Sequence, residues 1–288
     1  MKKLIALAMA GLMTATAFAG CGGSNDKKDS KADEKPATAS EATNDSAAGD
    51  WKYIADKGSM TIGITYFEPM NYKDKDGKLV GFETEFSEAV CEELGVTAKF
   101  QEIEWDSKEI ELSSKTIDCI WNGLTITDER KANMSITNPY MENKQVMVCK
   151  KENVEKFSTA EGVSGANVVA EAGSAGEDVG KQDKFFAEAN FESVESQATA
   201  LLEVKAGTAD IAIIDYVMSI GTLRSGSDFE NLSMVEAQSF SPEQYGIAFR
   251  KGSDATAKVN DAMKKLAENG KLKAIADKYN LTDLLLIK

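Results

Sequence analysis

The chain has 288 residues, a formal net charge of −14 and no histidine. The acidic balance argues against a surface for nucleic acid or anionic lipid, because both carry negative charge themselves. The lack of histidine excludes catalytic triads and metal sites that depend on imidazole, and the four cysteines do not have metal-ligand spacing. We therefore expect no cofactor and no metal site.

The first twenty residues have the layout of a secretory signal. Lys2 and Lys3 precede an apolar run over residues 4–18, which is short for a membrane span and is followed by small residues. Cys21 comes next, and residues 18–21 (Phe-Ala-Gly-Cys) resemble a bacterial lipobox, with phenylalanine where leucine is commonest. This resemblance implies that Cys21 carries lipid and anchors the protein to the cell membrane; the alternative is an ordinary signal with a chance cysteine.

A polar segment separates the signal from the folded part. Residues 22–50 contain no large apolar side chain, so they are predicted to form a disordered tether. The remaining residues, 51–288, suffice for one large domain or two lobes, and we favour two lobes. Cys91, Cys119 and Cys149 have apolar neighbours, which predicts buried side chains, although one bridge among them stays open.

Strands and helices alternate along the folded part. The first series is predicted as a strand at 60–64, a turn at 75–78, a helix at 83–94, a strand at 96–103, a helix at 107–114 and a strand at 118–121. The second series has an extended segment at 145–150, strands at 167–170, near Phe191 and at 211–214, and helices at 176–188 and 197–205. A strand at 245–249 and helices at 255–268 and 272–279 follow. This alternation predicts an α/β fold with a mostly parallel sheet covered on both faces.

Ligands of open α/β sheets bind beyond the carboxyl ends of strands, so the loops after residues 64, 121, 170 and 214 are the candidates. After residue 121, a turn and two hydroxyls precede a helix start that carries Arg130. Only three of the 33 basic residues are arginines, which suggests that the planar guanidinium of Arg130 is needed to bind a carboxylate. The alternative is a surface arginine paired with Asp128 or Glu129.

The other three loops add complementary groups. Aromatic residues after residue 64 can flank the apolar part of a ligand, or simply pack. The run 171–176 is an anion-binding turn in outline, or a helix cap. Asp215 ends a strand, where a carboxylate can face a cation or cap the following helix. Together, Arg130 and Asp215 match the two charges of an amino-acid zwitterion.

Residues 74–83 fit a calcium loop only partly, because Tyr72 occupies its first ligand position, so we interpret them as a surface turn.

Several short motifs make the chain similar to the bacterial extracellular solute-binding proteins of family 3, the polar amino-acid receptors of ABC importers. The resemblance covers nearly all of residues 51–281. The motifs are Gly81-Phe82-Glu83, residues 118–130, Asn138-Pro139-Tyr140, Gly173-Ser174, residues 209–215 and residues 245–252. It implies a type II periplasmic-binding-protein-like fold, with lobe 1 formed by residues 51–142 and 246–288 and lobe 2 by residues 143–245.

The resemblance also implies roles for individual residues. Arg130 would bind the ligand α-carboxylate with help from Thr125 and Ser174, and the Gly123 carbonyl and Asp215 would take the α-ammonium. Phe67 and Trp105 would sandwich the side chain, and Asn122 and Glu171 are candidates for selectivity. The full expected set is Tyr66, Phe67, Trp105, Asn122, Gly123, Thr125, Arg130, Glu171, Ser174, Ala175 and Asp215.

The implied mechanism is a clamshell that closes on an amino acid and delivers it to a membrane permease with its cytoplasmic ATPase. The hinges are expected near residues 143–145 and 244–246, and glutamine itself is disfavoured because the loop after residue 64 lacks the aspartate of glutamine receptors. Two alternatives stay open: a sensory receptor of the same fold, and an exported dehydratase-type enzyme.

Overall fold

The computed structural model describes residues 49–238 and 240–287. The predicted signal, the lipid site at Cys21 and nearly all of the predicted tether lie outside this part. Within it, no helix combines the length and the apolar character that a membrane crossing requires.

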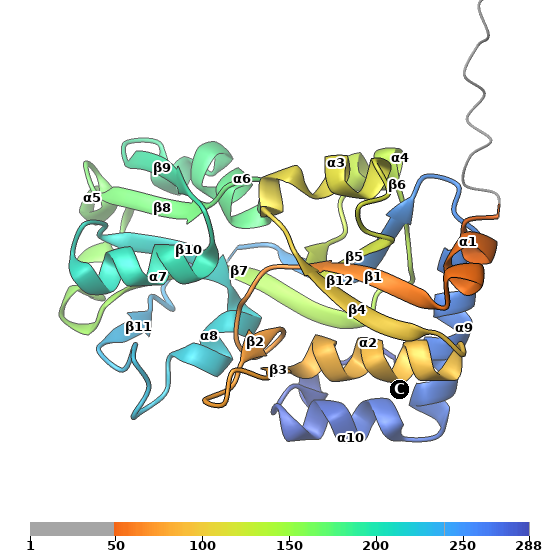
Figure 1. Ribbon diagram of the computed structural model, residues 1–288. Coiled ribbons are helices and arrows are strands. Elements are labelled where there is room, and N and C mark those ends of the chain that lie inside the picture. The colour runs from red at the N-terminus through yellow and green to blue at the C-terminus, as the bar shows by residue number, and fades with distance from the viewer. Residues whose placement is uncertain (1–48, 239, 288) are drawn as a thin grey trace, which may run out of the picture. The chain divides into compact units, whose positions relative to one another are not determined.

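The described residues form an α/β structure around one large mixed sheet (Figure 1). The strands are β1 (Ser59–Ile64), β2 (Tyr72–Lys73), β3 (Leu79–Val80), β4 (Thr97–Glu102), β5 (Cys119–Thr125), β6 (Met134–Ile136), β7 (Met141–Lys150), β8 (Asn167–Glu171), β9 (Asn190–Val194), β10 (Ile211–Asp215), β11 (Leu232–Met234) and β12 (Pro242–Arg250). The helices are α1 (Asp50–Lys57), α2 (Phe82–Glu93), α3 (Lys108–Ser113), α4 (Asp128–Asn133), α5 (Ala160–Val163), α6 (Ala175–Gln182), α7 (Gln197–Ala206), α8 (Tyr216–Thr222), α9 (Ala255–Glu268) and α10 (Lys271–Lys278).

The sheet consists of two parallel blocks joined by two long strands. Its order is β4-β1-β5-β12-β7-β10-β8-β9, with β6 added to β12 and β11 added to β7. Strands β4, β1 and β5 are parallel, as are β10, β8 and β9, whereas β12 and β7 run antiparallel to their neighbours. The prediction of a mostly parallel sheet is therefore wrong at its centre. The reason is that β7 carries the chain into the second block and β12 carries it back, so the two strands pair with each other in opposite directions.

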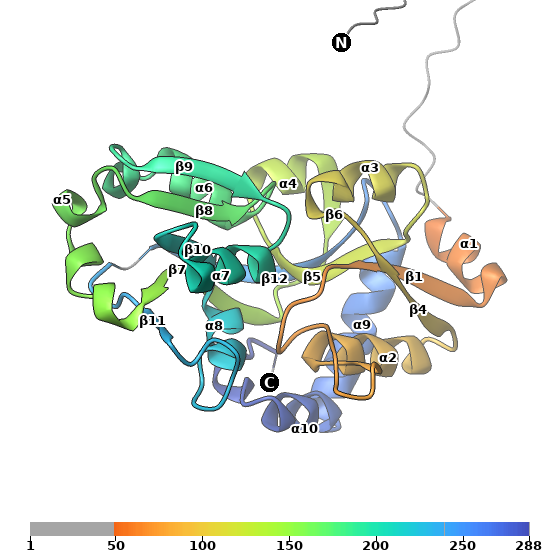
Figure 2. The ribbon, with the colours of Figure 1, turned by 60° about the vertical axis from the view of Figure 1, so that its left-hand side comes forward.

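Helices cover both faces of each block. In the first block, α2 packs against β4, α9 and α10, while α3 contacts β5 and β12. In the second block, α6 and α7 both contact β8 and β10, and Figures 1 and 2 show them on opposite faces of these strands. The predicted helix over residues 176–188 ends earlier, at Gln182, and a 3₁₀ turn follows over Lys184–Phe186.

Strand β5 is longer than the sequence predicts. The sequence predicts that it ends at residue 121 in a flexible turn, but it continues to Thr125 and every residue in it is buried. Pairing with β12 keeps it extended, and the register of that pairing shifts between Gly246 and Ala248. Gly123 has φ of +58°, which fits this irregularity, and a Cβ atom there would lie 3.0 Å from Cζ of Phe67.

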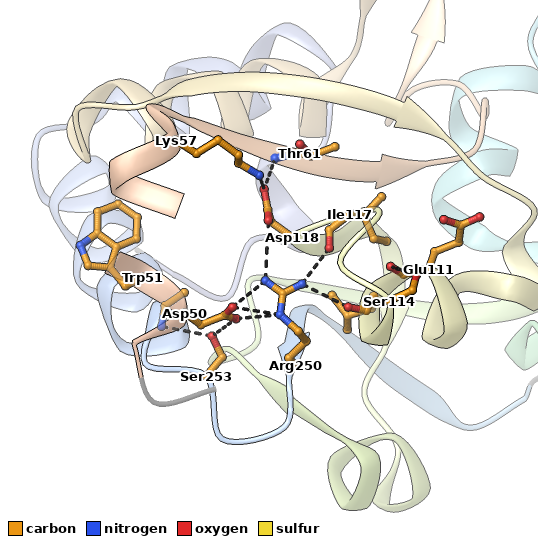
Figure 3. A network of polar contacts seen from close by, with 12 residues as sticks. Asp50, Trp51, Lys57, Thr61, Glu111, Ser114, Ile117, Asp118, Arg250 and Ser253 are labelled. Atoms are coloured by element: carbon orange, nitrogen blue, oxygen red, sulfur yellow. Dashed lines mark hydrogen bonds and ion pairs between the residues drawn. The ribbon is translucent and has the colours of Figure 1, made fainter. Parts of the chain in front are cut away.

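A buried ionic network joins α1 at the start of the described chain to residues beside β5 and at the end of β12 (Figure 3). Arg250 donates to the Asp50 carboxylate at 2.7–3.1 Å, and its Nη2 lies 3.6 Å from Oδ1 of Asp118. Lys57 forms an ion pair with Asp118, and the Ser253 hydroxyl donates to Asp50. Asp50 was assigned to the end of the tether, but it opens α1 and is 2% exposed, because its carboxylate neutralises Arg250.

The three cysteines of the described residues fill apolar positions. Cys91, Cys119 and Cys149 are free and buried, as their neighbours in the sequence predict. Burial raises the pKa of Cys91 to about 12 and that of Cys149 to about 11, so these thiols stay protonated and unreactive at neutral pH.

Candidate ligand-binding site

A cavity lies where strand ends of the two sheet blocks meet. It contains about 270 Å³ of space not filled by protein atoms. Its walls come from the segment after β1, the 3₁₀ turn before α3, β5 with α4, and the ends of β8, β9 and β10. The lining residues are Phe67, Trp105, Asn122, Gly123, Thr125, Arg130, Glu171, Ser174, Ala175, Gln197 and Asp215.

The structure thus brings together every predicted site residue except Tyr66. The Tyr66 ring is only partly buried and lies 4.6 Å from Nζ of Lys73, outside the cavity lining. Gln197 is a lining residue that the sequence reading missed. It is the first residue of α7, in the segment that follows β9. The predicted strand near Phe191 is short, so the loop after it is not among the four candidate loops. A polar residue at a helix start after a strand was the available signal.

Arg130 presents an unneutralised positive charge to the cavity. The Thr127 side chain caps α4 by accepting a hydrogen bond from the Arg130 amide at 3.1 Å. The guanidinium is buried, and it donates to the carbonyl oxygens of Thr125 at 2.7 Å and Gly173 at 3.2 Å. No carboxylate of the described residues forms an ion pair with it, so the alternative pairing with Asp128 or Glu129 is not what the structure shows. Burial lowers the pKa of Arg130, which is the cost of holding this charge without a counterion.

Gly123 is held in place by a carboxylate that does not line the cavity. Both oxygens of Glu83 accept hydrogen bonds from the Gly123 amide, at 2.9 and 3.1 Å, and further bonds come from Asn71 at 2.9 Å and from the Tyr140 hydroxyl. Burial raises the pKa of Glu83 to about 7, although these hydrogen bonds oppose the shift. Glu83 therefore positions the segment of β5 that borders the cavity.

Asp215 is surrounded by side-chain amides. Its Oδ1 accepts hydrogen bonds from Asn143 at 2.6 Å and Gln145 at 2.7 Å, and its Oδ2 accepts one from Gln197. It occupies the N-cap position of α8 without making a side-chain cap, so the alternative of a simple cap is not realised. Burial raises the pKa of Asp215, which has no ion pair among the described residues. Glu243 shares the same amides, and burial and Asp215 raise its pKa to about 7.

The turn after β8 combines a helix cap with contacts across the cavity. The Ser174 hydroxyl accepts a hydrogen bond from the Glu177 amide at 3.1 Å and so caps α6. This agrees with the interpretation of the turn as a helix cap. The Gly173 carbonyl oxygen accepts from Arg130 and, at 2.9 Å, from Nζ of Lys108. The turn therefore connects the two sheet blocks while Ser174 also lines the cavity.

The hydrogen-bonding groups of Asn122 are engaged within the protein. Its Oδ1 accepts from the Thr65 amide at 3.0 Å and hydroxyl at 2.7 Å, and its Nδ2 donates to the Thr65 carbonyl at 2.9 Å. Asn122 thus fixes the segment that leads to Phe67, and its role in selectivity stays a prediction.

Glu171 is the remaining ionisable residue of the lining, and it is buried with 3% exposure. Its Oε1 has no hydrogen-bond partner among the described residues. Burial and the nearby Asp215 raise the pKa of Glu171 to about 8, and the charge of Lys108 opposes this shift. The cavity lining therefore has one guanidinium and two carboxyl groups that form no ion pair within the described part of the chain.

Two α/β sheet blocks joined by antiparallel strands, with buried charged side chains of both signs lining one cavity, define a protein that binds small solutes. A profile of the bacterial extracellular solute-binding proteins, family 3, matches residues 60–282, and the chain belongs to this family. The predicted fold class and family are confirmed.

Individual relatives are similar over most of their length. The chain is 30% identical over 282 residues to the L-cystine-binding protein TcyA of Bacillus subtilis, covering 96% of this chain and 97% of TcyA. It is 33% identical over 234 residues to an L-arginine-binding protein of Pseudomonas aeruginosa, covering 79% and 89%. The crystal structure of a substrate-binding protein of an ABC uptake transporter from Streptococcus pneumoniae, with bound histidine, has a TM-score of 0.75 and 32% identity, covering 83% of this chain and 99% of that chain.

Proposed function

We propose that this protein captures a free polar amino acid in the cavity and delivers it to an ABC permease. One observation carries the proposal: Arg130 and Asp215 are buried charges of opposite sign, on different sheet blocks, and both line one cavity without an ionic partner among the described residues. A zwitterion supplies a carboxylate for the first and an ammonium for the second. Relatives named for cystine and arginine binding support this chemistry.

The transport step uses the two sheet blocks as lobes. Residues 51–142 with 246–288 form lobe 1, and residues 143–245 form lobe 2. The hinges lie near residues 143–145 and 244–246, where the paired strands β7 and β12 pass between the blocks. An amino acid that contacts Arg130 and Asp215 together favours the closed form, and the permease recognises that form.

The location of the protein follows from the residues before the fold. Lipid on Cys21 anchors it to the outer face of the cell membrane, and residues 22–49 connect that anchor to α1. The family description as extracellular supports export. Metabolic labelling with a lipid precursor tests the anchor: wild-type protein takes up label and Cys21→Ser protein does not.

A second candidate is a dehydratase-type enzyme, and Glu171 is the observation that favours it. A buried carboxyl that stays protonated near neutral pH can act as a general acid. Binding remains the proposal, because the relatives are named as binding proteins and Arg130 and Asp215 suffice for a zwitterion. Product formation from a prephenate-like substrate would favour the enzyme instead. A sensory role is separated from transport by whether genes for a permease and an ATPase adjoin this one.

A thermal-shift panel of the twenty amino acids tests the proposal. The protein is purified from residue 22 onward, because Asp50 belongs to the buried network of Arg250. A ligand at a hundred times its Kd adds about 2.7 kcal/mol to the free energy of unfolding. For a protein of this size the melting temperature then rises by roughly 5–10 °C. If no amino acid raises it, the proposal is wrong.

A further inference from the structure

We propose that the ligand carries a second cationic group on its side chain and that Glu171 binds this group. The inference rests on the proposed capture of an amino acid and specifies its class. Three kinds of ligand share the required chemistry: a guanidinium, a side-chain ammonium, or the second α-ammonium of a cystine-like molecule.

The first support is the isolation of the Glu171 carboxylate. It lines the cavity at 3% exposure, and its Oε1 has no hydrogen-bond partner among the described residues. No lysine or arginine of the described part forms an ion pair with it. A carboxylate in this position is costly unless a positive charge arrives to pair with it.

The second support is the charge balance of the lining. Its ionisable side chains are Arg130, Glu171 and Asp215. The α-carboxylate and α-ammonium of the ligand account for Arg130 and Asp215, which leaves Glu171 without a counterion. With a neutral ligand side chain this carboxyl stays protonated and has no ionic partner, whereas a cationic side chain pairs with its ionised form.

Lys108, the protein cation that influences the pKa of Glu171, makes its hydrogen bonds elsewhere. Lys108 donates to the carbonyl oxygens of Trp105 at 3.1 Å and Gly173 at 2.9 Å, and it lies 4.8 Å from the centre of the Trp105 ring. It lowers the pKa of Glu171 through space without contacting it, while Asp215 and Glu104 act in the opposite direction. Lys108 therefore leaves Glu171 available to a ligand.

The cavity also provides walls for the stem of such a side chain. The buried rings of Phe67 and Trp105 both line it. Aromatic faces bind methylene chains by dispersion and attract a guanidinium or ammonium through their quadrupole. The aromatic rings and Glu171 together suit an apolar stem that ends in a positive charge.

Calorimetric titration with matched ligands tests the inference. L-arginine is compared with L-citrulline, which has nearly the same shape without the charge, and L-lysine with L-glutamine; L-cystine tests the second α-ammonium. We expect at least one of the doubly cationic ligands to bind about thirtyfold or more tighter than its neutral counterpart, since an unpaired buried charge costs a comparable factor.

The Glu171→Gln variant isolates the residue. Glutamine has nearly the shape of a protonated glutamate, so an unchanged melting temperature without ligand verifies the fold. We expect the preference for arginine over citrulline to fall below threefold. Glu192→Gln is the matched control, because Glu192 is exposed on β9 and away from the lining, and it should keep the full preference.

The pH dependence gives a second readout. The groups that face Glu171 are Asp215, Lys108 and Glu104, with Gln197 as a hydrogen-bond donor. Because a cation binds the ionised carboxylate, affinity for arginine should rise from pH 6 to pH 8 with release of a proton. Titrations in buffers of different ionisation enthalpy measure that proton, and Glu171→Gln should reduce its release.

Three results would overturn the inference. Citrulline or glutamine binding as tightly as the charged ligands would show that Glu171 binds as a neutral hydrogen-bond donor. An undiminished arginine preference in Glu171→Gln would place the cation elsewhere. Failure of every amino acid to bind would refute the proposed function itself, which is distinct from the loss of charge preference alone.

Discussion

The three arginines of this chain should respond to truncation in different ways, and Arg130→Ala against Arg250→Ala is the sharpest comparison. Both guanidinium groups are buried in the structure, at 8% exposure each. Arg250 pairs with Asp50 and also donates to the carbonyl oxygens of Leu112 and Ile117 at 3.1 and 2.8 Å. Within residues 49–238 and 240–287, Arg130 contacts two carbonyl oxygens and no carboxylate. We therefore expect Arg250 to serve the fold and Arg130 to serve the ligand.

The magnitudes follow from these partners. Arg250→Ala leaves Asp50 buried without its counterion, which should cost about 3–5 kcal/mol of unfolding free energy and lower the melting temperature by roughly 10 °C. Arg130→Ala loses two hydrogen bonds but also relieves an unpaired buried charge, so the unliganded melting temperature should change by no more than about 3 °C. Its ligand affinity should fall by about a hundredfold or more.

The assay is thermal unfolding with and without the best ligand of the amino-acid panel, followed by calorimetry on the folded variants. Arg250→Ala should bind that ligand with nearly wild-type Kd once folded, because Arg250 does not line the cavity. A ligand-binding role for Arg130 is refuted if Arg130→Ala lowers the unliganded melting temperature as much as Arg250→Ala does while keeping its ligand-induced shift. Arg130 would then be a structural residue.

Two further predictions concern the other buried and bridging charges. Arg224 pairs with Glu68 at 2.7 Å across the proposed lobes, so Arg224→Ala should weaken ligand binding by up to about fivefold in low salt and less in high salt; equal affinities in low salt would show that the pair does not assist closure. Glu83 has a pKa raised by burial to about 7, so the native protein retains a proton that the unfolded chain releases, and the stability from this group falls as pH rises from about 4.5 to 7. In urea unfolding without ligand, Glu83→Gln should therefore lose stability relative to wild type at pH 5, and the difference should shrink by about 3 kcal/mol by pH 8. If the unfolding free energies of the two proteins change with pH in parallel, this prediction is wrong.

The site residues that the sequence located share one property, which is their place just after a strand. Arg130, Glu171 and Asp215 were found because the strand ends of an α/β sheet gather at a common edge, and local hydrophobic patterns suffice to mark strand ends. The same reasoning failed for Gln197, since β9 is short and only partly buried and gives a weak pattern. Tyr66 is in the predicted set because it adjoins Phe67 on the same loop, and the sequence does not show which of the two rings lines the cavity.

The alternation of strands and helices, the family and most of the cavity lining could be predicted from the amino-acid sequence, because these depend on local periodicity and on motifs within a few residues. The partners of the buried charges became visible only in the folded structure. Asp50 and Arg250 are separated by 200 positions, yet they form one ion pair, and Glu83 reaches Gly123 from 40 positions away. Such pairs form only when packing brings distant segments together, and for Glu83 the accompanying burial raises the pKa. Because Arg130 and Arg250 are equally buried, the presence or absence of a carboxylate partner distinguishes the structural arginine from the one available to a ligand.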